Sequence, residues 1–299
     1  MFSNLGIFFL TSLIGATVGT LVKLLVFHLD PLTIVAIRFF LGLLIIAPFV
    51  FKRQLIKKLI SDKFLISTGI LFSVNVILYA IGIQYTSLIV GMLLYVLTPL
   101  IVAILGYFFL KEKLTGNQIV GLLLSLVGVS ILIWNSFKTA DILSFGRPLG
   151  NLLIGIAVLT WSLYIVISKK NTRKFNPWEI TLTNFMVACM ISILALGPLI
   201  ANGKLNYSFN LKINLMAVSL AIIALLFIVG YQFLIKNTSA FISSLNIYMQ
   251  TILSSIFGVI LFGEKLKLNL ILGALLIITG VFLATSYRYI MVAKGKIWT

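Results

Sequence analysis

Ten long apolar stretches follow one another along the sequence, and they limit what this chain can fold into more than any other feature. Charges, prolines or clusters of Asn and Gly separate them. They lie at about residues 5–27, 31–51, 64–83, 87–110, 115–135, 148–168, 177–200, 213–235, 239–262 and 268–288. An α-helix rises about 1.5 Å per residue, so about 20 residues cross a hydrocarbon core of roughly 30 Å. The pattern predicts an all-α integral membrane protein with ten transmembrane helices.

The composition agrees with lipid as the main solvent. Hydrophobic residues make up 61% of the 299 residues and charged residues only 10%, against roughly 25% charged in a soluble domain. No core of this size hides so much apolar surface from water, which excludes a water-soluble globule. The formal net charge of +17 lies mostly in short basic runs between the apolar stretches. We therefore expect these basic residues to meet membrane lipids and not nucleic acid.

The basic residues also predict the orientation of the chain. If the N-terminus is cytoplasmic, 15 of the 23 Lys and Arg lie on the cytoplasmic side, 6 lie outside, and Lys23 and Arg38 lie within helices. Cytoplasmic loops of membrane proteins carry an excess of Lys and Arg. The count predicts a multi-pass protein of the cell (inner) membrane with both termini in the cytoplasm.

The second half of the sequence repeats the first. Residues 85–114, which begin Tyr-Thr-Ser and end Lys-Glu-Lys-Leu, align without a gap on residues 237–266, which begin Asn-Thr-Ser and end Gly-Glu-Lys-Leu. The offset there is 152 residues; nearer the start of each half it is 146, which pairs Lys23 with Lys169 and Phe39 with Phe185. The chain thus divides into two repeats of five predicted helices, residues 1–136 and 137–299.

Five is an odd number of crossings, so the second repeat enters the membrane in the opposite orientation to the first. Inverted repeats are typical of secondary transporters, in which a central site opens first to one side of the membrane and then to the other. We therefore expect a transporter that works by alternating access.

Several motifs in this pattern point to a known family. Each half ends in a Glu-Lys-Leu box followed by a helix with glycines seven residues apart, and Arg38-Phe39-Phe40 lies early in the second predicted helix. The first half also contains Thr98-Pro99-Leu100 ahead of Leu110-Lys111-Glu112-Lys113-Leu114. Over nearly its whole length the chain resembles the EamA type of the drug/metabolite transporter superfamily.

The resemblance implies a secondary transporter that moves small polar metabolites, such as amino acids or related compounds, across the cytoplasmic membrane, with export as the favoured direction. Uptake or exchange of a metabolite is the alternative. Two departures from the family pattern concern the pocket. First, family members often have a Trp near the position of Ile14-Gly15, and this chain has none there, although Trp161 stands at the corresponding place in the second half. Second, the second half has Thr251 at the position that corresponds to Pro99.

Motifs that the sequence lacks limit the energy sources that could drive transport. It contains no phosphate-binding Gly-x-x-x-x-Gly-Lys-Ser/Thr loop. Proton coupling generally uses a carboxylate or His inside the membrane, whereas all six acidic residues here lie in predicted loops or at helix ends, and His28 lies at the outer boundary. We expect exchange or facilitated transport, with no catalytic residue, metal or cofactor. The alternatives are proton coupling through Asp30 and His28, or a lipid-modifying enzyme that uses the same pair.

Uncharged polar side chains at mid-depth are the candidates for binding a polar solute, because they offer hydrogen bonds without the cost of a buried charge. They are Asn75, Tyr79, Tyr95, Thr98, Trp161, Tyr164, Tyr231, Asn246 and Gln250. The alternative for each is a hydrogen bond between helices. Arg38, roughly 10 Å from its helix end, is the candidate to meet a substrate carboxylate or phosphate; the alternative is that it reaches the outer interface or a helix-end carbonyl. For Lys23 and Lys169, nearer helix ends, we expect the interface.

Pro99 lies halfway along the stretch at 87–110. Proline removes a helix hydrogen bond there, so we expect a kink, with the freed carbonyl facing a water-lined cavity. The equivalent helix has Thr251, whose hydroxyl permits a milder bend by bonding to its own backbone.

Glycines recur on the last helix of each half. Gly121 and Gly128, like Gly273 and Gly280, lie seven residues apart on one face. Small residues let helix backbones approach closely. We expect this packing to occur within the chain; a homodimer through these helices is the alternative to a monomer.

Overall fold

The computed structural model of the protein describes residues 2–50, 61–86, 88–139, 147–201, 210–262, 272–273 and 275–284. All regular elements among these residues are α-helices. In chain order they are α1 (Phe2–Leu25), α2 (Pro31–Val50), α4 (Lys63–Gly82), α5 (Leu88–Tyr95), α6 (Thr98–Leu110), α7 (Gly116–Thr139), α8 (Pro148–Asn171), α9 (Pro177–Ala201), α10 (Leu211–Asn237), α11 (Ala240–Ser244) and α12 (Asn246–Phe262), followed by a short helix at Leu275–Ala284.

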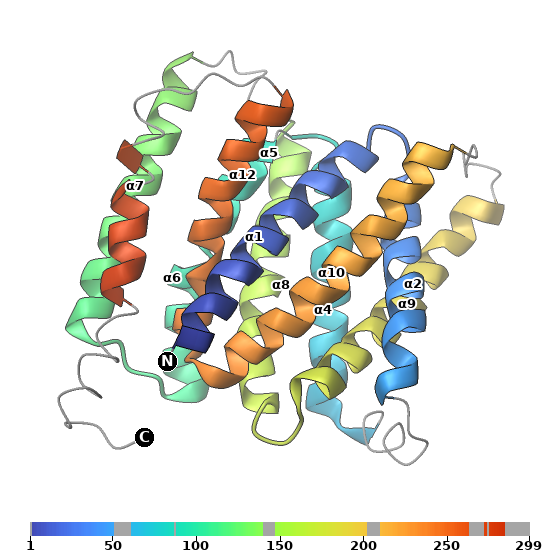
Figure 1. The fold of residues 1–299 in the computed structure, drawn as a ribbon, viewed down its shortest axis with the longest axis horizontal. Coiled ribbons are helices and arrows are strands. Elements are labelled where there is room, and N and C mark those ends of the chain that lie inside the picture. Colours follow the sequence, from blue (N-terminus) through green and yellow to red (C-terminus); the bar gives the residue numbers. More distant parts are fainter. Residues whose placement is uncertain are drawn as a thin grey trace.

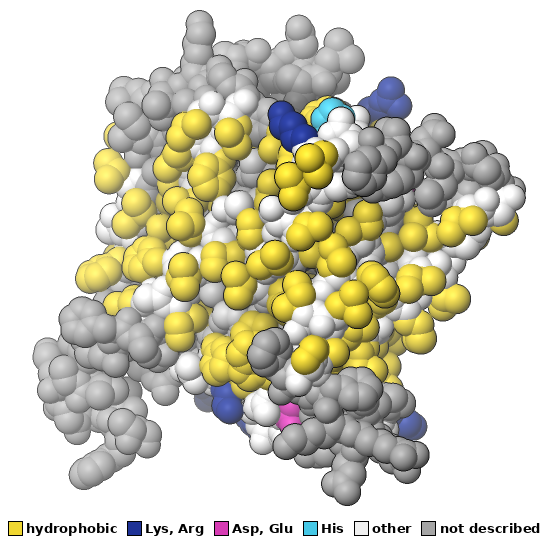
Figure 2. Space-filling view, turned by 45° about the vertical axis from the view of Figure 1, so that its right-hand side comes forward, with side chains coloured by type: hydrophobic (Ala, Val, Ile, Leu, Met, Phe, Trp, Pro, Cys, Tyr) yellow, Lys and Arg dark blue, Asp and Glu magenta, His cyan; other side chains and the backbone are white. Residues whose placement is uncertain are grey.

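The described helices form a bundle whose sides are apolar. Seven of them, within the described residues, are long and apolar enough to cross a membrane, and three further apolar helices are shorter. Figure 1 shows the helices running side by side between the same two ends of the molecule. Figure 2 shows hydrophobic side chains over the middle of the surface and charged side chains at its upper and lower edges. The prediction of an all-helical membrane protein is confirmed.

Local sequence explains where several helices begin. Proline is the first residue of α2, α8 and α9, a position where its missing N–H has no helical acceptor and its fixed φ suits the helix. Asp62 caps α4, because its carboxylate accepts hydrogen bonds from the N–H groups of Phe64 and Leu65. Asn210 caps α10 in the same way.

Loops that were predicted to share a side of the membrane contact one another. At one end of the bundle, the Lys174 ammonium lies 3.6 Å from a carboxylate oxygen of Asp62. At the other end, the N–H of Arg147 donates to the carbonyl of Tyr85 at 2.7 Å. Both contacts agree with the predicted alternation of the loops.

The stretch at 87–110 is not one kinked helix, as was predicted, but two helices. α5 ends at Tyr95 and α6 begins at Thr98, so that Pro99 lies in the first turn of α6. The proline ring excludes the hydrogen bond to the Tyr95 carbonyl and collides with that turn, so the helix ends and a new one starts.

The equivalent stretch at 239–262 is also interrupted, and not where the bend was predicted. α11 ends at Ser244 and α12 begins at Asn246, so the break lies at Leu245 and not at Thr251. The Thr251 hydroxyl does bond to its own backbone, donating to the Ile247 carbonyl at 2.9 Å. This bond replaces no missing N–H, and the helix continues through it.

The glycines of the last helix in each half pack against each other within the chain. A Cβ atom added at Gly121 would lie 2.4 Å from the carbonyl oxygen of Gly280, and one added at Gly128 would lie 2.7 Å from that of Gly273. Figure 1 shows α7 and the short helix of residues 275–284 side by side at one edge of the bundle. The glycine faces are therefore buried in contacts inside one molecule.

Candidate substrate pocket

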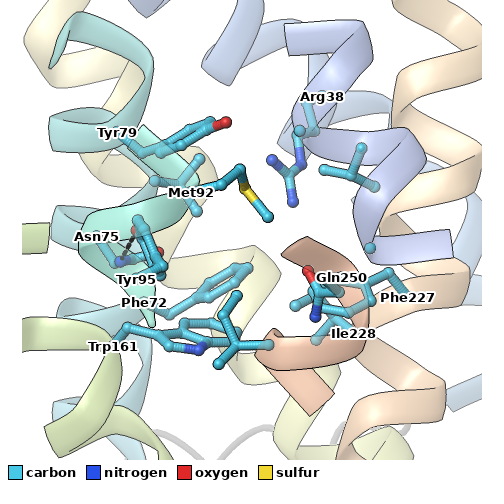
Figure 3. Close-up of a pocket in the computed structure, with 15 residues that line it drawn as sticks. Arg38, Phe72, Asn75, Tyr79, Met92, Tyr95, Trp161, Phe227, Ile228 and Gln250 are labelled. Atoms are coloured by element: carbon cyan, nitrogen blue, oxygen red, sulfur yellow. Dashed lines mark hydrogen bonds between the residues drawn. The ribbon is translucent and has the colours of Figure 1, made fainter. Parts of the chain in front are cut away.

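A cavity of about 90 Å³ lies among α1, α2, α4, α5, α8, α10 and α12. This is several times the space that one water molecule requires, about 10–15 Å³. Residues of both sequence halves line it: Gly15, Val18, Gly19, Arg38, Phe72, Asn75, Val76, Tyr79, Met92 and Tyr95 from the first, and Trp161, Phe227, Ile228, Ile247 and Gln250 from the second. Figure 3 shows these side chains around the cavity.

Arg38 is the cation of this cavity. It comes from α2, and its guanidinium points into the space between Tyr79 and Gln250 (Figure 3). Only 5% of Arg38 is exposed, and its Nε has no hydrogen-bond partner among the described residues. The ring of Phe39 lies 5.3 Å from its guanidinium carbon. A buried guanidinium with an unsatisfied Nε, and with no acidic residue among the described lining residues, is costly, so the arrangement favours an anionic ligand.

Two tyrosines and an amide form the wall opposite Arg38. The Asn75 side-chain amide donates to the Tyr95 hydroxyl and to the Ala157 carbonyl, both at 2.7 Å. The Tyr79 hydroxyl is buried without a hydrogen-bond partner among the described residues. This wall thus holds Asn75 and Tyr95 rigidly and leaves the Tyr79 hydroxyl for a solute.

Gln250 is held in place from behind. Its amide nitrogen donates to Asn246 at 2.6 Å. Asn246 in turn donates to the Phe8 carbonyl and to the hydroxyls of Thr11 and Ser12 at 2.7–3.0 Å. Asn246 therefore links α12 to α1 and positions Gln250, and it does not line the cavity.

Trp161 lies at the floor of the cavity, in contact with a cluster of stacked aromatic rings. The ring of Trp161 lies nearly parallel to those of Tyr164, Tyr231 and Phe227, with centroids 4.9, 5.4 and 6.5 Å apart. In Figure 3, Trp161 and Phe72 lie at the end of the cavity away from Arg38. The cavity is thus polar and cationic at one end and aromatic at the other.

Of the ten residues predicted to bind substrate, six line this cavity: Arg38, Asn75, Tyr79, Tyr95, Trp161 and Gln250. The other four lie in the surrounding layer. Tyr164 accepts hydrogen bonds from Asn184 and Gln232, and Tyr231 donates to the Ser243 carbonyl. Thr98 and Asn246 are fully buried away from the cavity.

Sequence reasoning missed the small and apolar lining residues. Gly15 and Gly19, four residues apart on α1, both line the cavity. A Cβ atom at Gly15 would lie 2.6 Å from the Gln250 side chain and 2.8 Å from Phe227. The spacing of these glycines was visible, but nothing in the sequence alone tells a packing face from a cavity face. Phe72 and Met92 carry no polar signal at all.

Two lysines that were expected at the interface instead bind helix-end carbonyls. The Lys23 ammonium donates to the Ile83 carbonyl at 2.8 Å, just beyond α4. The Lys169 ammonium donates to the Ile235 carbonyl at 2.9 Å, near the end of α10. Each also binds the carbonyl three residues further along the chain. Carbonyls at a helix C-terminus lack helical donors, so an ammonium is a favourable partner for them.

Asp30 and His28, the pair considered for an enzyme or for proton coupling, lie outside the cavity. Asp30 accepts a hydrogen bond from the N–H of Leu32 at 2.8 Å, at the start of α2, and His28 is exposed. Among the described residues, no group of three or more His, Cys, Asp or Glu is placed to hold a metal ion.

Comparison with known proteins agrees with this architecture. The EamA-like transporter family matches residues 3–134 and again residues 148–286. An uncharacterized transporter of Clostridium kluyveri is 28% identical over 84% of this chain and 82% of its own length. The uncharacterized transporter YyaM of Bacillus subtilis is 29% identical over 91% and 90%. A solved crystal structure superimposes with a TM-score of 0.70 over 95% of this chain and 97% of that one, at 19% identity, which supports the fold. The chain belongs to the EamA-like transporter family, as its motifs predicted.

Proposed function

We propose that this protein is a secondary transporter of small polar metabolites, such as amino acids or related compounds, that works by alternating access and exports its substrate from the cytoplasm. The observation that supports this best is the cavity itself. It is lined by helices of both sequence halves, and it contains a buried guanidinium with an unpaired Nε. Such a group is expected to bind a substrate carboxylate through charge-assisted hydrogen bonds, which are strong when water is excluded.

Contacts between equivalent residues support an inverted arrangement of the halves. Phe39 and Phe185, 146 residues apart, place their rings edge to face at 5.2 Å. The Ser125 hydroxyl lies 3.5 Å from the carbonyl of Ile277, which is 152 residues further along. Equivalent residues of two repeats meet where a two-fold axis passes between them, and with an odd number of predicted helices in each repeat such a pair of halves is inverted.

The two lysine contacts support alternating access. Lys23 and Lys169 are equivalent in the repeat, and so are their acceptors Ile83 and Ile235. We place the first contact at the outer end of the cavity and the second at the cytoplasmic end, one turn beyond Tyr79 and Tyr231 respectively. We propose that opening to each side of the membrane breaks the contact at that side.

Replacing either lysine by methionine is expected to favour opening at its own end. Lys23→Met removes the outer contact, so a cysteine placed at Val18 should react faster with an impermeant thiol reagent added outside. Lys169→Met should slow that reaction and speed labelling from the cytoplasmic side. Hydrogen bonds to a charged group contribute about 1.5–3 kcal/mol, which corresponds to changes of roughly tenfold or more in labelling rate. Cys189 is the single native cysteine and is replaced by Ser in all samples.

Lys170→Met is the matched control for the lysine variants. The Lys170 ammonium lies 4.4 Å from the ring centre of Phe64, so the change removes a neighbouring charge but not the carbonyl contact. It should leave both labelling rates unchanged. If Lys23→Met and Lys169→Met shift accessibility in the same direction, the two contacts are not gates of opposite sides.

The orientation predicted from the basic residues has its own test. Arg173 and His28 are both exposed, in loops that the sequence places on opposite sides of the membrane. In whole cells, a cysteine at His28 should react with an impermeant reagent and a cysteine at Arg173 should not. The reverse pattern would mean that the whole chain is inverted.

Reconstitution tests the transport function itself. Purified protein in liposomes, loaded with pooled labelled metabolites, should release some of them faster than protein-free liposomes do. Adding the same metabolites outside distinguishes exchange, which accelerates release, from facilitated export, which does not need them. No release of any metabolite in either arrangement would contradict the proposal.

A further inference from the structure

The described residues that line the cavity carry one positive charge and no negative charge. Arg38 is cationic, and none of the described residues that line the cavity is acidic. The four acidic residues in the described part of the chain lie at helix ends, where Asp62 and Asp30 cap α4 and α2 and Glu179 bonds to the N–H of Asn176. Glu112 accepts a hydrogen bond from the N–H of Ala240.

We propose that the preferred substrate is a small organic monoanion without an ammonium group, such as a 2-hydroxy acid with an apolar body. The inference rests on the proposed transport function and narrows its substrate class from amino acids and related compounds to the related acids that lack an ammonium group. A monoanion neutralises Arg38 and leaves the loaded cavity without net charge. An amino acid also brings an ammonium group, which would stay buried without a counter-charge, and burial of an unpaired charge is strongly unfavourable.

The polar groups of the cavity offer no negative charge to balance a substrate ammonium group. Tyr95 already accepts a hydrogen bond from Asn75, so its own proton remains to be donated to a solute. Arg38 supplies only donors. The amide oxygens of Asn75 and Gln250 are acceptors, but they are neutral. The cavity is therefore richer in donors than an ammonium ligand requires, and a carboxylate with a hydroxyl group matches it better.

The apolar body is assigned to the other end of the cavity. Trp161, Phe72 and Phe227 line that end, and Met92 lies between them and Arg38 (Figure 3). Flat aromatic walls bury apolar surface and contact planar or branched groups well. A substrate with its carboxylate at Arg38 would place its side chain here.

The charge of such a substrate also supports the direction of transport. An inside-negative membrane potential drives an anion outward, by about 50-fold in concentration per 100 mV. A zwitterion experiences no such force. A monoanion carrier therefore needs no intramembrane proton site to export its substrate.

The test compares pairs of ligands that differ only in the charged group. Alanine, leucine and phenylalanine are each paired with the 2-hydroxy acid of the same side chain, and binding to the purified full-length protein is measured by tryptophan fluorescence and calorimetry. At least one hydroxy acid should bind, and it should bind at least tenfold more tightly than its amino acid.

Equal or tighter binding of the amino acid would overturn the inference. Binding of neither member of any pair would also overturn it, while release of other pooled metabolites from liposomes would still uphold the transport function.

Gln250→Glu supplies the missing counter-charge with little change of shape. If the unpaired ammonium is what excludes amino acids, this variant should narrow the tenfold difference or reverse it. A difference that Gln250→Glu leaves unchanged would mean that charge is not the cause of the preference.

Discussion

Replacing Arg38 by glutamine is expected to weaken the binding of carboxylates by about 1 to 3 kcal/mol, because the variant loses a charge-assisted hydrogen bond at a buried position. Uncharged ligands should be nearly unaffected. The measurement is the ratio of affinities for an acid and for its uncharged amide, in wild type and variant. A general folding defect lowers both affinities and cancels from this ratio.

Two further variants separate substrate binding from packing. Arg38→Lys keeps the charge but loses the planar pair of donors, so it should retain part of the preference for acids. Arg173→Gln makes the same chemical change at an exposed loop position, and it should leave the ratio unchanged. An unchanged ratio in Arg38→Gln would remove Arg38 from the substrate site and leave the tyrosines and amides as the recognition surface.

Gly121→Ala is expected to destabilise the protein by about 1–3 kcal/mol, the usual cost of overpacking a close contact. The added Cβ would lie 2.4 Å from the Gly280 carbonyl oxygen and 2.8 Å from the Cβ of Ala284. Backbone atoms cannot rotate away as a flexible side chain does, so α7 and the helix at 275–284 would have to separate. Thermal unfolding in detergent should report a lower melting temperature.

Gly155→Ala provides the matched control. This glycine lies within α8, and a Cβ atom there would meet nothing within 4 Å. Alanine is favoured over glycine inside a helix by about 1 kcal/mol, so this variant should be as stable as wild type or more stable. The two substitutions are chemically identical, but Gly121→Ala should lower the melting temperature and Gly155→Ala should leave it unchanged or raise it. If both raise the melting temperature, the glycine faces are not in close contact in the membrane protein.

Prediction of the helices succeeded where the residues of one segment are enough to form and start the helix. Apolar length predicted the membrane helices, and Pro31, Pro148 and Pro177 marked the first residues of three of them. It failed at the breaks. Pro99 indicated a disturbance but not that α5 and α6 would be separate helices, and Leu245 gave no indication of a break at all.

The sequence predicted six of the residues that line the cavity, but not which side of each helix faces it or which residues are neighbours. Trp161 and Tyr164 are three residues apart on one helix and were expected to share a cavity, yet Trp161 lines it while Tyr164 bonds to Asn184 and Gln232. Asn184 is the repeat equivalent of Arg38. Its amide bonds to Tyr164, so the guanidinium that points into the cavity comes from the first half.

The sequence by itself determined that the chain is a bundle of membrane helices, because the match of a helix to the bilayer depends on that helix's own composition. Its repeat and its motifs also determined that the chain has two related halves and which family it belongs to. It also placed the polar candidates in the middle parts of the predicted helices. Only the tertiary structure decided which of them meet. A cavity is the space left between side chains of several helices, here seven, and its walls depend on packing distances such as those at Gly15 and Gln250 that no single segment contains.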